Sequence, residues 1–145
     1  MKIKQGGFTL IELIVTLAVF AIVASIAAPS LGNMISQQNL NKSSRELAAI
    51  LSQARAKAAL ERREVTVQLN STAVNDDDTL NWSPDGQAAL TTTTTSIVFL
   101  PTGLVQGAVG DTTFTICDSA TDAQKSKTIS ISRMGTIQTP VDGDC

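Results

Sequence analysis

The sequence has no histidine and no tyrosine, one tryptophan and only two cysteines among its 145 residues. Histidine is the most common general base and the most common neutral metal ligand in proteins, so its absence removes the usual starting point for an active site. We therefore expect no enzymatic activity, no metal site and no cofactor. The length leaves room for one domain with an N-terminal appendage.

Charge is scarce at the N-terminus, where Glu12 is the only charged residue in the stretch GGFTLIELIVTLAVFAIVASIAAPSL. As a helix, the 21 residues from Phe8 to Ala28 would span about 31 Å, close to the thickness of the hydrocarbon core of a bilayer. Their Leu, Ile, Val and Phe side chains favour insertion by roughly 5 kcal/mol, which exceeds a cost of about 3 kcal/mol for a central Glu. The sequence predicts a transmembrane helix over residues 8–28.

Lys2 and Lys4 precede this segment with no acidic residue beside them. By the positive-inside rule the N-terminus stays in the cytoplasm and the remainder of the chain is exported. The alternative is a secretory signal peptide that ends at the small residues of ASIAA and releases a soluble exported domain. The acid within the apolar run and the helical pattern that resumes after Pro29 both count against that alternative.

Residues 29–63 continue the helix as an amphipathic segment. One face, spaced by three and four residues, predicts packing against the rest of the chain; it consists of Leu40, Ser44, Leu47, Leu51, Ala54 and Ala58. A soluble coiled coil is an alternative, although Ser44 and two Ala dilute the repeat. Pro29 predicts a kink or local melting of the helix near residues 29–32.

Residues 64–145 change to the alternating pattern of β-strands and form the predicted head. Strands are expected at residues 64–69, 96–100, 113–117 and 127–132, with a hairpin over residues 131–139 that turns near Gly135. The stretch NDDDTLNWSPDGQ, residues 75–87, is expected to be a loop. The predicted fold class is α+β, with an antiparallel sheet laid across the helix.

Cys117 and Cys145 lie in the exported part, where oxidation is permitted. A disulfide between them is favoured over two free thiols, and by closing a loop it would stabilise the head by roughly 3–4 kcal/mol in the loop-entropy model. The run Asp76, Asp77 and Asp78 could attract Ca²⁺. It lacks the ligand spacing of an EF-hand loop, so a solvated surface loop is the favoured interpretation.

The residues Gly7-Phe8-Thr9-Leu10-Ile11-Glu12, after a short basic leader, resemble the type III signal of type IV pilins and type II secretion pseudopilins. The resemblance implies that residues 1–7 form a leader and that a prepilin peptidase cuts between Gly7 and Phe8. It also implies that Phe8 is N-methylated and that Glu12 pairs with the N-terminal amine of a neighbouring subunit during assembly. The alternative for Glu12 is a side chain that reaches the cytoplasmic headgroups.

The passage SSRELAAILSQARAKAALERREVTV, residues 43–67, and the C-terminal Cys are similar to the GspH/FimT/FimU group of minor pilins. This implies a minor pilin in a complex that primes pilus assembly at or near the tip. Its expected partners are prepilin peptidase, other minor pilins and the major pilin, first in the inner membrane with the head in the periplasm and then in the pilus at the cell surface. One alternative is the H-type pseudopilin of a type II secretion system.

A DNA-binding pilin of the FimT type is a further alternative. Those relatives carry a G-R-x-R pattern at a turn near the C-terminus, whereas this sequence reads Gly135-Thr136-Ile137-Gln138. The head has three basic and ten acidic residues, a net charge of −7, which repels phosphates. We therefore expect no DNA binding, although Lys125, Lys127 and Arg133 could form a small basic patch. Residues 42–63, with six basic and two acidic residues, suggest electrostatic contacts with the acidic head of another subunit.

Overall fold

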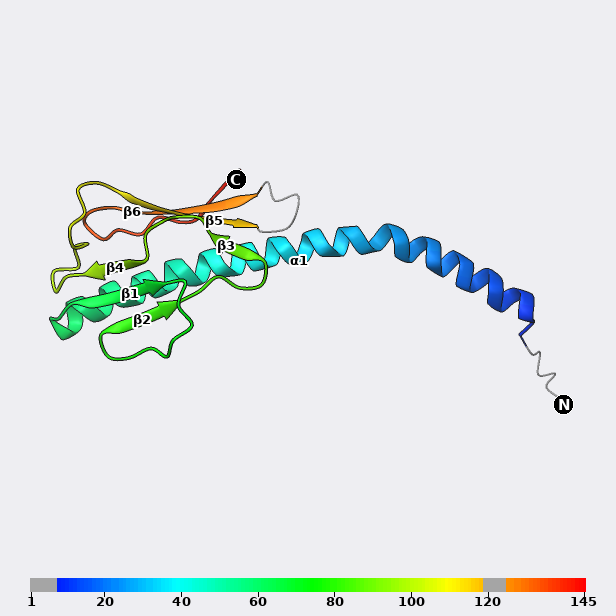
Figure 1. The fold of residues 1–145 in the computed structure, drawn as a ribbon, viewed down its shortest axis with the longest axis horizontal. Helices are drawn as coiled ribbons and strands as arrows, with labels where there is room; N and C mark the ends of the chain where they lie inside the picture. Colours follow the sequence, from blue (N-terminus) through cyan, green and yellow to red (C-terminus); the bar gives the residue numbers. More distant parts are fainter. Residues whose placement is uncertain (1–7, 119–124) are drawn as a thin grey trace, which may run out of the picture. The chain divides into compact units, whose positions relative to one another are not determined.

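In a computed structural model of the protein, residues 8–118 and 125–145 are described. They form one helix and seven strands, and the chain divides into two compact units, residues 1–35 and 36–145. Helix α1 (Leu10–Glu61) contributes to both units (Figure 1). Its backbone stays helical through residues 29–32, so the melting expected there is not found. The single hydrogen bond that Pro29 cannot donate is not enough to end a helix of 52 residues.

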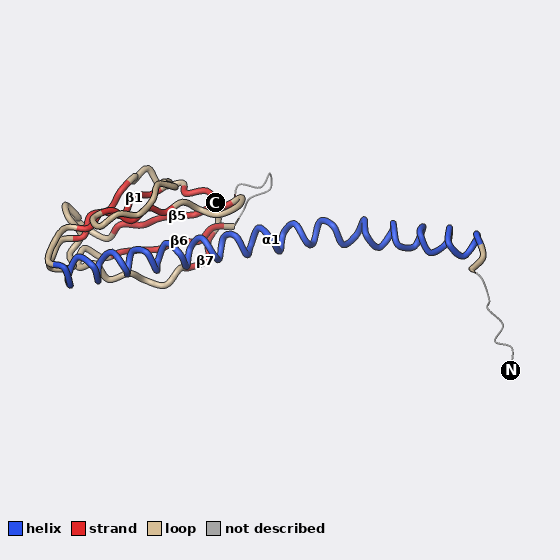
Figure 2. Tube along the Cα trace, turned by 90° about the horizontal axis from the view of Figure 1, so that it is seen from below, coloured by secondary structure: helices blue, strands red, loops and turns tan. Residues whose placement is uncertain are grey.

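The amphipathic face expected within α1 is confirmed. Leu47, Leu51, Ala54 and Ala58 are fully buried, and Leu40 is only 4% exposed. The strands lie alongside this C-terminal part of the helix (Figure 2). They complete a single hydrophobic core with the helix through the buried residues Val65, Val67, Leu69, Leu80, Trp82, Ile97, Phe99, Val105, Phe114, Ile116, Ile129 and Ile131.

The strands form two sheets. The first has the order β2-β1-β4, made of β1 (Val65–Leu69), β2 (Thr79–Trp82) and β4 (Ser96–Phe99). The second has the order β3-β5-β6-β7, made of β3 (Ala88–Leu90), β5 (Thr112–Asp118), β6 (Ser126–Ile131) and β7 (Val141–Gly143). The α+β class is confirmed, and every strand pair is antiparallel except β1 with β2, which is parallel.

Three of the strands, β2, β3 and β7, were not predicted from the sequence. Strand β2 lies inside residues 75–87, which were expected to be a loop, because Asp, Asn, Pro and Gly surround a short alternating TLNW segment. Strands β3 and β7 have three residues each and weak strand propensity, so only their pairing with β5 and β6 defines them. The expected hairpin is confirmed by a bridge between Ile131 and Ile137, with Gly135 in the turn at a φ of +76°.

Polar side chains of α1 hold the loop before β3. The Ser43 hydroxyl, which is fully buried, accepts a hydrogen bond of 2.9 Å from the Asp85 N–H. Lys42 forms an ion pair with the Asp85 carboxylate. Gly86 has a φ of +59°, and a Cβ atom there would lie 2.2 Å from the Asn39 amide nitrogen. This loop therefore packs closely on the helix, which the polar composition of residues 36–43 did not reveal.

Candidate functional site

The N-terminal part of α1 presents an uncovered apolar surface. Every side chain described between Phe8 and Ile35 is exposed, including Ile11 at 71% and Phe20 at 75%. By length and composition, α1 is the one helix among the described residues that is long and apolar enough to cross a membrane. An apolar surface of this size requires a bilayer or other protein chains to cover it.

Glu12 lies in the first turn of α1, next to a helix cap formed by Thr9. The Glu12 N–H donates to the Thr9 hydroxyl at 3.3 Å, and the Leu13 N–H donates to the Thr9 carbonyl oxygen at 3.2 Å. A Thr at the N-cap followed three residues later by Glu is the pattern of a capping box. The Glu12 carboxylate forms no ion pair with any described residue.

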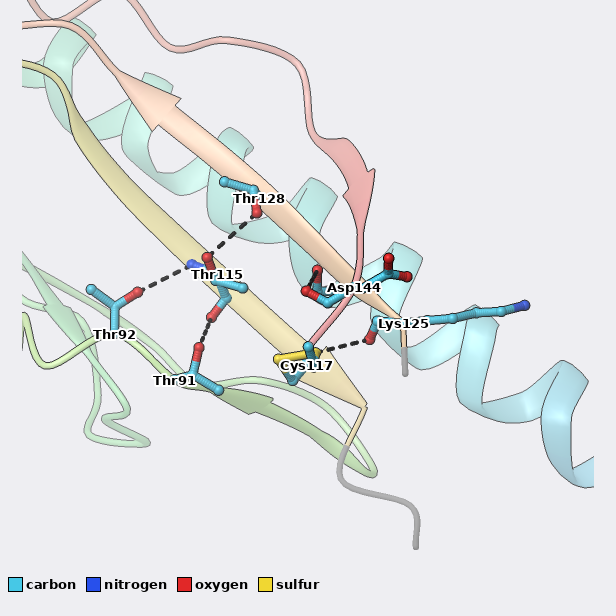
Figure 3. The surroundings of a disulfide bond; sticks show 9 residues. Thr91, Thr92, Thr115, Cys117, Lys125, Thr128 and Asp144 are labelled. Atoms are coloured by element: carbon cyan, nitrogen blue, oxygen red, sulfur yellow. Dashed lines mark hydrogen bonds between the residues drawn. A yellow bond between two sulfur atoms is a disulfide. The ribbon is translucent and has the colours of Figure 1, made fainter. Parts of the chain in front are cut away.

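A disulfide joins Cys117 of β5 to Cys145, as the sequence suggested, with 6.0 Å between the two Cα atoms (Figure 3). Two further contacts hold the same end of the chain: the Ser126 hydroxyl donates to the Asp144 carbonyl oxygen, and Lys127 pairs with Asp142 at 2.6 Å. The C-terminal segment is thus fixed to the second sheet.

Threonines extend the pairing of β3 with β5. The backbone N–H and the hydroxyl of Thr91 both donate to the Thr115 carbonyl oxygen, and the Thr115 N–H donates to the Thr92 hydroxyl (Figure 3). The start of the Thr run, residues 91–95, is therefore anchored to the second sheet.

The acidic run at residues 76–78 is engaged within the protein. The Asp76 carboxylate accepts N–H bonds from Asp78 at 2.9 Å and Thr79 at 2.6 Å, and these bonds hold its pKa below the ordinary value. Asp78 pairs with Arg63, which also donates to the Asp77 carbonyl oxygen at 2.6 Å. Over residues 8–118 and 125–145, no group of three or more acidic or cysteine residues could hold a metal ion. The structure gives the calcium alternative no support.

The basic residues of the head do not all lie together. Lys125 and Arg133 flank opposite ends of β6, a strand whose length puts about 20 Å between them. Lys127 is neutralised by Asp142. Lys125 and Lys127 line one pocket together with Asp142 and Asp144, so the three-residue basic patch considered from the sequence is not formed.

Arg55 occupies a site that the sequence did not predict. Its Nε donates to the Gly103 carbonyl oxygen at 3.3 Å and its Nη2 to the Met134 carbonyl oxygen at 3.2 Å. Gly103 and Gly135, both buried with positive φ, lie under the side chain. Because 79 positions separate Arg55 from Met134, no local sequence pattern links them.

Two family models match the sequence. The prokaryotic N-terminal methylation motif covers residues 2–28, which include Gly7, Phe8 and Glu12. The model described as type II transport protein GspH covers residues 43–135, more than half of the chain. The chain belongs to the GspH family. Members of this pilin and pseudopilin family are structural proteins. The methylation motif of this GspH-family pilin implies a membrane anchor, processing by prepilin peptidase and association with other pilins.

Solved structures support the same fold. This GspH-family pilin is similar to the type IV minor pilin FimU of Pseudomonas aeruginosa PAO1 in two crystal forms. In the first, the identity is 22% and the TM-score 0.53, over 73% of this chain and 91% of the other. In the second, the identity is 26% and the TM-score 0.50, over 68% of this chain and 90% of the other. No curated protein sequence matches the chain.

Proposed function

We propose that this GspH-family chain is a minor pilin of a type IV pilus, where it joins a complex of minor pilins at or near the tip that primes assembly. Before assembly, residues 8–28 hold it in the inner membrane with the head in the periplasm. The observation that carries this proposal is the uncovered apolar surface of α1, which contains one carboxylate without an ion pair to any described residue and coincides with the N-terminal methylation motif.

The mechanism of assembly follows from the cost of a charge in an apolar phase. Prepilin peptidase cuts between Gly7, which lies outside the described residues, and Phe8, whose new amine is then methylated. The exposed apolar side chains of α1 pack laterally against the helices of other minor pilins and of the major pilin. A carboxylate in that environment needs a partner of opposite charge, and the N-terminal amine of a neighbouring subunit supplies it. Glu12 thereby sets the register between subunits, and no reaction is catalysed.

Mass spectrometry of the mature N-terminus tests this proposal directly. We expect an N-methylated Phe8 and recovery of the protein with pili sheared from the cell surface. A mature chain that begins near Pro29 or Ser30 would show instead that residues 8–28 are a cleaved signal peptide and that the head is secreted as a soluble domain.

A second candidate is the H-type pseudopilin of a type II secretion system, favoured by the description of the matching GspH model as a type II transport protein. Deletion of the chain separates the two machines. Loss of surface pili with normal protein secretion supports the minor pilin, whereas loss of secretion with normal pili supports the pseudopilin.

The DNA-binding alternative is disfavoured because the head carries a net charge of −7 and acidic residues lie beside its two lysines. We expect no retardation of DNA in a gel-shift assay with the full-length protein at physiological salt.

A further inference from the structure

We propose that a groove beside Arg55, in the unit formed by residues 36–145, binds a carboxylate side chain presented by an acidic segment of a neighbouring pilin subunit. The identity of this partner rests on the proposed function. The groove has a volume of about 440 Å³ and lies between α1 and two turns of the head. It is lined by Ser52, Arg55, Ala56, Ala59, Thr102, Gly103, Thr136 and Ile137.

The Arg55 guanidinium has a charge that nothing in the described chain neutralises. Its two hydrogen bonds go to neutral carbonyl oxygens, and no described carboxylate pairs with it. A guanidinium has five N–H donors, and the bonds to Gly103 and Met134 use the edge formed by Nε and Nη2. The end formed by the two Nη atoms is left for a ligand. This planar pair of donors matches a carboxylate in bidentate geometry.

Two glycines hold the guanidinium in place. At Gly135, a Cβ atom would lie 2.1 Å from the Gly103 carbonyl oxygen and 2.9 Å from Arg55 Nε. A Cβ atom at Gly103 would lie 3.4 Å from the same Nε. The turn backbones can approach Arg55 this closely only because both positions lack side chains, so the orientation of the charged group is set before a ligand arrives.

The other residues that line the groove suit an acidic protein segment. None of them is acidic, Ser52, Thr102 and Thr136 supply hydroxyl groups, and Ala56 and Ala59 leave the helix surface low enough for close approach. Residues 42–63 carry a net charge of +4 and the head carries −7. A neighbouring subunit with a head of similar composition would therefore be electrostatically complementary to this face of α1.

An NMR titration of the full-length protein in detergent micelles tests the site, with the Arg55 Nε–H resonance as the reporter. The probe is a peptide with the sequence of residues 74–80, VNDDDTL, and its control is the same peptide with Asn in place of each Asp. We expect a saturable shift with the acidic peptide, weaker in high salt, and binding of the Asn peptide that is about tenfold weaker or less.

Three variants make the titration specific. Arg55→Gln removes the charge, and Ser52→Asp adds a competing carboxylate to the groove without touching the Arg55 bonds, since the Ser52 hydroxyl donates only to Ala48. We expect both variants to bind the acidic peptide about tenfold more weakly. Because Arg55→Gln lacks the Nε–H reporter, its binding is followed through the resonances of the neighbouring backbone amides. Lys57→Gln removes the same charge two residues along the helix and outside the groove, and we expect it to bind as the parent does.

Several results would overturn the proposal. They are equal binding of the acidic and Asn peptides, no saturable shift, loss of binding in Lys57→Gln as large as in Ser52→Asp, or tighter binding of a thymidine oligonucleotide than of the peptide. The last result would assign the groove to nucleic acid. In cells, a photo-crosslinking residue at Ala56 should capture an acidic segment of a pilin, and capture of only non-pilin proteins would refute the partner. The mature N-terminus tests the pilin function separately, so the two failures are distinguishable.

Discussion

The N–H of Glu12 is hydrogen-bonded to the hydroxyl of Thr9 at the first turn of α1, with 3.3 Å between the two atoms. Glu12 therefore occupies the third helical position after an N-cap, where an acidic side chain also interacts favourably with the helix dipole. This position gives Glu12 two separable roles, one in starting the helix and one in pairing with another subunit.

Glu12→Gln separates these roles, because glutamine also suits this position of a capping box but carries no charge. We expect Glu12→Gln and Glu12→Ala to enter the membrane normally and both to be depleted from pili, since removal of one partner leaves the other charge unpaired in an apolar phase at a cost of about 3 kcal/mol. Immunoblots of sheared pili and membranes measure this. Normal incorporation of Glu12→Gln would show that the charge of Glu12 does not direct assembly.

Replacing both Cys117 and Cys145 by Ser should destabilise the head by about 3–4 kcal/mol, because the disulfide closes a long loop. The two cysteines are 28 positions apart. Denaturant unfolding of the full-length protein in detergent, followed by the fluorescence of Trp82, measures the change. The parent protein with its disulfide reduced is the control and should match the double variant. A loss of unfolding free energy below about 1 kcal/mol would mean that noncovalent contacts alone hold the C-terminal segment on the second sheet.

A series of Gly→Ala changes should separate backbone strain from steric conflict. Gly110 has neither a positive φ nor a neighbour within 4 Å, Gly107 has only the positive φ of +69°, and Gly135 combines a φ of +76° with the close Gly103 carbonyl oxygen. We expect little change for Gly110→Ala, a loss of about 1 kcal/mol for Gly107→Ala and more than about 2 kcal/mol for Gly135→Ala. Thermal unfolding measures the stability of the three variants. Equal stability of Gly107→Ala and Gly135→Ala would contradict the close approach of Gly135 to the Gly103 carbonyl oxygen.

Leu47→Ala should cost about 2–5 kcal/mol of unfolding free energy, because Leu47 is fully buried against the sheets. Leu60→Ala is the matched control on the same helix, since its side chain is 82% exposed. We expect that change to stay within about 0.5 kcal/mol of the parent. Comparable losses for the two variants, measured by denaturant unfolding, would contradict the assigned buried face.

The ion pair of Lys42 and Asp85 predicts a dependence on pH. The hydrogen bond from Lys42 lowers the pKa of Asp85 below its ordinary value of 3.8 and raises the pKa of Lys42 above 10.5. The contribution of Asp85 to stability is therefore complete above pH 3.8 and is lost as the pH falls through its folded pKa, whereas that of Lys42 is lost only above pH 10.5. Lys42→Gln should raise the pKa of Asp85, measured by NMR titration of its carboxyl carbon. An unchanged midpoint would rule out the pair in solution.

Regular patterns made much of the head predictable from the sequence. The spacing of Leu47, Leu51, Ala54 and Ala58 identified the buried face of α1, and alternating β-branched residues identified β1, β4, β5 and β6. The short strands β3 and β7 depend on neighbours distant in sequence rather than on local propensity. The position of Arg55 over Gly103 and Gly135 is likewise a product of tertiary structure, since each residue taken alone indicates only a polar helix surface or a turn.

Strand β7 has a protective role beyond its own stability. It pairs with β6 through only three residues, and covalent attachment at Cys145 keeps it there. Were it to leave, the outer N–H and C=O groups of β6 would form an open edge, on which strands of other molecules can add. Material folded in a reducing cytosol would accordingly be prone to aggregate through that edge, so an oxidising compartment safeguards the solubility of the head as well as its stability.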